Sequence, residues 1–94
     1  MTSSEIESKI RRFVGQNYLH APSADRLPGS DSFLEKGIVD STGILEMIAF
    51  LEAEFGVKVE DEELTPENLD SVDRLVGFVG RKLLARASPP GSIR

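Results

Sequence analysis

The residues best suited to chemistry are serines that follow an aspartate. Such pairs occur at positions 31–32, 40–41 and 70–71. Helix capping alone explains all three, because aspartate and serine are preferred at helix starts. Only Asp40-Ser41 comes after an apolar stretch, 37–39, and opens a predicted helix that carries several glutamates. Ser41 is therefore the candidate functional hydroxyl.

Two further features invite a catalytic or metal-binding interpretation. A hydrolase that pairs Ser41 with His20 would turn over esters without any modification, and we expect none, because a lone loop histidine lacks a partner within reach. The acidic run 60–63 fails as a calcium loop. A loop starting at Asp61 puts Pro66 at the glycine position and Val72 at the position of the bidentate glutamate. We expect a solvated acidic turn and no metal site.

Helical spacing of apolar residues predicts the elements that position Ser41. Isoleucines 6 and 10 with Phe13 and Val14 indicate a helix from Ser4 to Tyr18, capped by Ser3 or Ser4. A second helix should run from Ser41, capped by Asp40, to Phe55 before the stop residue Gly56. Its apolar face holds the five residues Ile44, Met47, Ile48, Leu51 and Phe55.

Two more helices complete the predicted fold. A one-turn helix should span Thr65 to Leu69, with threonine as cap and Pro66 at its first position. Ser71 should cap a last helix that ends near Ala87. Only residues 57–60 alternate at period two, which is too short to support a sheet. The chain is thus predicted to be all-α, a small four-helix bundle of three main helices and one short helix, over residues 1–87, with a disordered tail at 88–94.

A long loop and one face of the second helix also carry information about function. A connection as long as 20–36 either carries function or packs its own apolar side chains, here Leu27, Phe33 and Leu34. Opposite the apolar face of the second helix lies a mixture of small, apolar and acidic side chains. These are Thr42, Glu46, Ala49 and Ala53, with Leu45 and Glu52 on the flank nearest Ser41. This mixture would suit a surface that docks on a basic partner. An ordinary solvent-exposed face explains it equally well.

Composition and charge limit the classes of function. The 94 residues suffice for one domain, and the absence of cysteine excludes disulfides, zinc knuckles and thiol nucleophiles built from this chain. The net charge of −5 disfavours binding to the phosphate backbone of a nucleic acid. Residues 35–73 hold twelve acidic and two basic residues, so partners should have positive surfaces. Without an apolar run for a signal peptide or a membrane span, we expect a cytoplasmic protein. The short chain favours a discrete protein, which we expect to be a monomer.

The sequence resembles the acyl carrier protein superfamily, which includes peptidyl and aminoacyl carriers. Three segments carry the resemblance: FLEKGIVDS at 33–41, LEMIAFLEAEFGV at 45–57 and LTPENLDSV at 64–72. The spacing between the segments fits as well as the segments do. The resemblance implies a four-helix bundle whose serine at the start of the second helix bears 4′-phosphopantetheine, which a transferase adds from coenzyme A. Ser41 matches that serine.

The resemblance also implies roles for neighbouring residues. Asp40 matches the aspartate that helps the transferase place its magnesium ion and cofactor. Glu46 and Glu52 match acidic positions that meet basic partner surfaces. The sequence departs from the family at Thr42, where leucine is most common. It also departs at Gly43, where many fatty-acid carriers have an acidic residue. Both departures affect which transferase and partner enzymes dock here.

A non-enzymatic carrier is the function that the resemblance implies. It would hold acyl or aminoacyl groups as thioesters on the arm attached to Ser41, which supplies the thiol that the chain lacks. Its partners would be a phosphopantetheinyl transferase, a loading ligase and downstream enzymes of fatty-acid, polyketide, nonribosomal peptide or related biosynthesis. The alternative is a helical interaction or regulatory domain without a prosthetic group, in which Asp40-Ser41 is only a cap.

Overall fold

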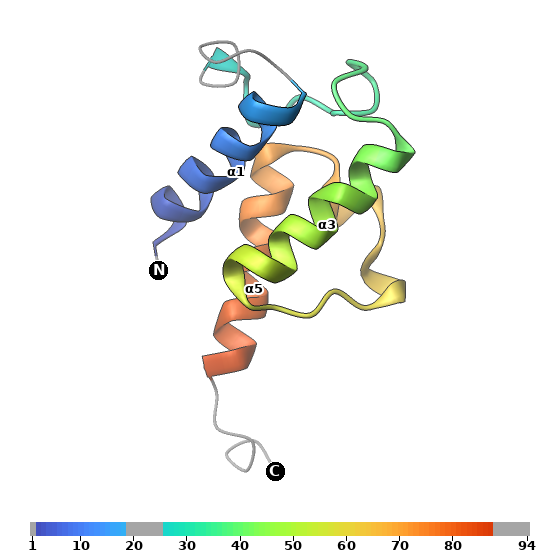
Figure 1. Ribbon diagram of the computed structural model, residues 1–94. Coiled ribbons are helices and arrows are strands. Elements are labelled where there is room, and N and C mark those ends of the chain that lie inside the picture. Colours follow the sequence, from blue (N-terminus) through green and yellow to red (C-terminus); the bar gives the residue numbers. More distant parts are fainter. Residues whose placement is uncertain (1, 19–25, 88–94) are drawn as a thin grey trace.

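The computed structural model describes residues 2–18 and 26–87. His20 and the predicted tail 88–94 lie outside these residues. The described ranges contain helices and no strand, which confirms the all-α prediction of three main helices and one short helix (Figure 1). The α-helices are α1 (Ser3–Asn17), α3 (Ser41–Phe55), α4 (Pro66–Leu69) and α5 (Val72–Ala87), and a 3₁₀ turn, η1 (Asp61–Glu63), precedes α4.

The start of α1 differs from the prediction. Thr2 is its N-cap, not Ser3 or Ser4. The Glu5 amide donates to Thr2 Oγ1 at 3.1 Å, and the Thr2 amide donates to Glu5 Oε1 at 2.8 Å. This capping box needs a glutamate three residues after the cap, which Ser3 lacks. Ser4 has one in Glu7, but the Glu7 carboxylate accepts a hydrogen bond from Arg11. The helix therefore begins at Ser3.

Both ends of α3 lie where the sequence predicts them. The Asp40 carboxylate accepts a hydrogen bond from the Gly43 amide at 2.8 Å. At the other end Gly56 has a φ of 66°, a left-handed conformation that glycine adopts without a Cβ penalty. The start signal, Asp40, and the stop signal, Gly56, are both adjacent to the helix in sequence. The bounds of the fifteen-residue helix could therefore be predicted from the sequence.

The core is formed by the apolar faces of α1, α3 and α5, with α1 packed along α5 and α3 crossing in front of it (Figure 1). Of the predicted apolar face of α3, Met47, Leu51 and Phe55 are buried, while Ile44 and Ile48 are half-buried. The two half-buried isoleucines line a surface groove, described below. The buried core residues of the three long helices are Ile6, Ile10, Val14, Met47, Leu51, Phe55, Val72, Leu75, Phe78 and Val79.

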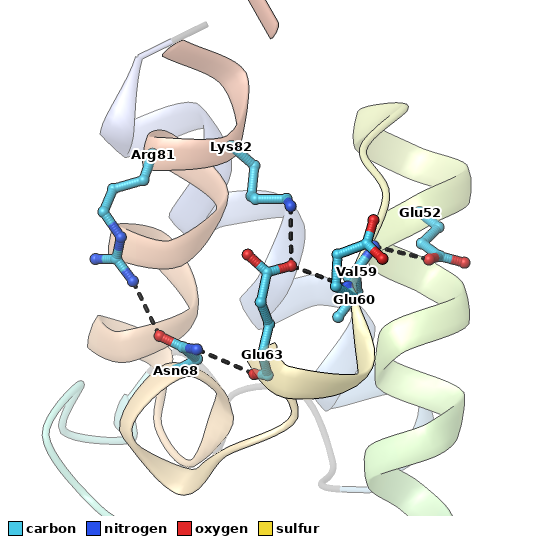
Figure 2. A network of polar contacts seen from close by, with 7 residues as sticks. All are labelled: Glu52, Val59, Glu60, Glu63, Asn68, Arg81 and Lys82. Atoms are coloured by element: carbon cyan, nitrogen blue, oxygen red, sulfur yellow. Dashed lines mark hydrogen bonds and ion pairs between the residues drawn. The ribbon is translucent and has the colours of Figure 1, made fainter. Parts of the chain in front are cut away.

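A polar network fastens the connection between α3 and α4 to α5 (Figure 2). Lys82 Nζ lies 2.9 Å from Glu63 Oε1, and that oxygen also accepts from the Glu60 amide at 2.9 Å. Asn68 donates to the Glu63 carbonyl and accepts from Arg81. The prediction of a solvated turn holds for Asp61 and Glu62, which are exposed, and is wrong for Glu63, which is half-buried beside a lysine from another helix.

The loop before α3 is organised around Phe33, whose side chain is fully buried. Its amide donates to the Asp70 carbonyl at 2.8 Å, and its carbonyl accepts from the Ile38 amide at 2.9 Å. Leu27 packs against the core as predicted, but the prediction that Leu34 packs inside is wrong, because 46% of its surface is exposed. The Leu34 amide is held by the Asp70 carboxylate, and this anchoring leaves the side chain outside.

Candidate functional site

Ser41 is the first residue of α3 and is exposed. The first-turn amides of an α-helix have no intrahelical acceptor, so they give this end a partial positive charge. The Asp40 side chain satisfies one of these amides, at Gly43. A phosphodiester on Ser41 would lie beside the remaining amides, in a setting that favours an anion. The residues present thus fit an exposed, covalently attached phosphate group.

An open, mainly apolar groove of about 300 Å³ adjoins Ser41. One wall comes from α3, and the other comes from the connection to α4 and from α4 itself. Three leucines around it, Leu34, Leu45 and Leu64, are 46%, 63% and 42% exposed. Few other large apolar side chains in the described part of the chain face solvent, so the exposed leucines concentrate at this site. The groove is lined by Leu34, Ser41, Ile44, Leu45, Ile48, Leu64, Thr65, Pro66, Leu69 and Asp70.

The mixed face predicted on α3 is largely open to solvent. Exposed on it are Thr42, Leu45, Glu46, Ala49 and Ala53. Glu52 is half-buried, and its Oε2 accepts a hydrogen bond from the Val59 amide at 2.9 Å (Figure 2). Glu52 therefore helps to hold the connection after α3, whereas Glu46 stands beside the start of the helix.

Tyr18 is a site residue that the sequence reasoning missed. It follows the last residue of α1, and its hydroxyl lies 2.7 Å from Glu46 Oε1 and 3.1 Å from the Gly43 carbonyl oxygen. Partial burial, followed by the hydrogen bond to Glu46 and the charges of Glu46 and Asp40, raises the pKa of the phenol well above its ordinary value of 10. No local pattern announces this contact, because 28 positions separate the two side chains.

Other chemistry finds no support in the residues described. His20 lies outside them, and no base is seen to contact the Ser41 hydroxyl within them. No group of three or more potential metal ligands is found there. No described helix combines the length and apolar character needed to cross a membrane.

Comparisons with known proteins point in one direction, although no family model matches the chain. An acyl carrier protein of Thermosynechococcus vestitus is 34% identical over 85 residues, which cover 90% of this chain and all of the relative. The protein named "Probable acyl carrier protein PigG" of a Serratia species is 30% identical, over 81% of this chain and 86% of the relative. The acyl carrier protein of Petrotoga mobilis is 29% identical, over 88% and 93%.

Proposed function

Because this chain belongs to the acyl carrier protein family, we propose that it carries 4′-phosphopantetheine on Ser41 and presents acyl or aminoacyl groups to biosynthetic enzymes in the cytoplasm. Members of this family are non-catalytic carriers, and a covalently attached 4′-phosphopantetheine is their general property. The prosthetic group supplies a thiol that holds the cargo as a thioester. Residues 1–87 are the carrier domain in this proposal.

The observation that carries the proposal is the exposure of Ser41 at the first position of a capped helix. The hydroxyl is open to a modifying enzyme, and the helix end favours the phosphate that would replace the hydroxyl proton. Asp40 has two roles in this account. Its carboxylate caps α3, and it assists the phosphopantetheinyl transferase in placing magnesium and coenzyme A.

The docking surface proposed for partner enzymes runs along the outer face of α3, from its start to its last turn. It consists of Thr42, Leu45, Glu46, Ala49, Glu52 and Ala53. Exposed leucine and alanine supply apolar contact, while Glu46 supplies charge for the basic surfaces of a loading ligase and downstream enzymes. Glu52 Oε2 also accepts a hydrogen bond from the Val59 amide, so this carboxylate serves the fold as well as the proposed surface.

Intact-mass spectrometry tests the proposal. Apo protein is incubated with coenzyme A, magnesium and a broad-specificity phosphopantetheinyl transferase, and we expect a gain of one phosphopantetheine. Ser41→Ala should abolish the gain. Ser32→Ala, which changes another Asp-Ser pair, should retain it, and circular dichroism verifies that both variants fold. No gain in the wild type would favour the interaction domain without a prosthetic group, and a gain that survives Ser41→Ala would exclude Ser41.

A further inference from the structure

Tyr18 joins the end of α1 to the exposed start of α3. Its ring makes an edge contact with Phe13, with centroids 5.8 Å apart and planes at 74°. From that position the hydroxyl reaches Glu46 Oε1 at 2.7 Å and the Gly43 carbonyl at 3.1 Å. The shorter contact goes to the charged acceptor, as expected for a charge-assisted hydrogen bond. The ring is thus packed on one helix while its hydroxyl holds a carboxylate of another.

Gly43 is what allows the ring to come so close. A Cβ at this position would lie 2.6 Å from Val39 Cγ1 and 3.3 Å from Tyr18 Cε1. Val39 is itself buried, so it has little room to move away. The absence of a side chain at Gly43, where the sequence departs from the family pattern, therefore leaves room for the tyrosine that follows α1.

The Tyr18 hydroxyl lies among negatively charged side chains. Asp40 and Glu46 line the same surface depression as Tyr18, together with Thr42. Neither carboxylate has a cationic partner among the residues that the structure describes. A neutral phenol restricts the Glu46 rotamer without cancelling its charge, which a lysine in the same place would do. The carboxylate therefore remains open to an incoming cation.

We infer that Tyr18 is a positioning residue of the docking surface, which holds the Glu46 carboxylate in place to receive an arginine or lysine of a partner enzyme. The inference rests on the proposed function, since it assumes that partners dock on the outer face of α3. A carboxylate already held in one orientation loses less freedom when the partner binds. The contact should therefore affect binding of the carrier and not the chemical step of the partner.

The contact itself can be tested without any partner. Tyr18 is the only tyrosine of the chain, and tryptophan is absent, so absorbance at 295 nm on raising the pH reports the ionisation of this phenol alone. Samples are followed to about pH 11, with far-UV circular dichroism verifying the fold. The wild type should ionise at higher pH than Glu46→Gln. Glu54→Gln, which removes a charge elsewhere on α3 that pairs with Lys9, should behave like the wild type. Equal curves for the wild type and Glu46→Gln would overturn the inference.

Its consequence for docking is tested by transferase kinetics with the carrier as the varied substrate. Tyr18→Phe keeps the ring and removes the hydroxyl, and we expect KM to rise about threefold with kcat unchanged. Glu46→Gln should also raise KM. The double variant should resemble Glu46→Gln alone, because the hydroxyl acts only through that carboxylate. Additive effects, or an unchanged KM in Tyr18→Phe, would overturn the inference. A wild type that accepts no phosphopantetheine would instead refute the proposed function and leave the absorbance result standing.

Discussion

At the scale of single residues, the serines of the three Asp-Ser pairs differ in exposure and in the hydrogen bonds that their hydroxyl groups make. Ser32 Oγ donates to the Asp70 carboxylate, and Ser71 is 1% exposed and accepts from the Arg74 amide. Ser41 is exposed, and no hydrogen bond of its hydroxyl is seen within the described part of the chain. Two of the serines serve the fold, so Ser41 is the one open to modification.

The two roles proposed for Asp40 can be separated by substitution. Asp40→Ala removes the acceptor for the Gly43 amide and should lower the free energy of unfolding by about 0.5–2 kcal/mol. Asp40→Asn retains a capping oxygen and should keep most of that stability while slowing transfer of phosphopantetheine. Urea denaturation and transferase assays measure the two effects. If the asparagine variant is as unstable as the alanine variant, the capping role is wrong.

At the scale of elements, local signals could be predicted and tertiary ones could not. Asp40 and Gly56 act on their own helix, so the bounds of α3 follow from the sequence. The orientation of Leu34 depends on Asp70, and that of Glu52 depends on Val59, which follows the end of the helix. Hydrophobic periodicity carries no information about such contacts. For the same reason Tyr18 could not be assigned to the site.

The network that fastens the connection to α5 predicts a loss of stability in acid. The hydrogen bond from the Glu60 amide, followed by the one from Lys82, lowers the pKa of Glu63 below its ordinary value of 4.5. The folded chain thus binds fewer protons than the unfolded chain, so this contribution is present above about pH 4.5 and is lost as the pH falls further. Urea denaturation at pH 6 and pH 3 should show a smaller loss for Glu63→Gln than for the wild type. Glu62→Gln, at an exposed neighbour, serves as control, and an equal loss in Glu63→Gln and the wild type would contradict the account.

At the scale of the whole molecule, charge is distributed unevenly. The net charge of −5 conceals an excess of ten negative charges between residues 35 and 73, the segment that includes α3 and the groove beside Ser41. Such a field attracts positively charged surfaces from a distance and orients the encounter. The electrostatics of the chain thus agree with its placement among carriers that dock on separate enzymes.

Salt should therefore weaken recognition by the transferase. Raising the ionic strength from about 0.1 M to about 1 M shortens the screening length from about 10 Å to about 3 Å. KM for the carrier should rise severalfold while kcat changes little, and Glu46→Gln should show a shallower dependence. A KM that is insensitive to salt would mean that apolar contact alone governs docking.

Tryptic peptide mapping of the transferase-treated protein tests the central claim most directly. Cleavage after Lys36 and Lys58 releases the peptide 37–58, in which Ser41 and Thr42 are the only hydroxyl side chains, and the serines of the other two Asp-Ser pairs fall in different peptides. The account predicts that tandem mass spectrometry finds phosphopantetheine on this peptide, with fragment ions that place it on Ser41. Phosphopantetheine on Thr42, or on a peptide that holds Ser32 or Ser71, would contradict it.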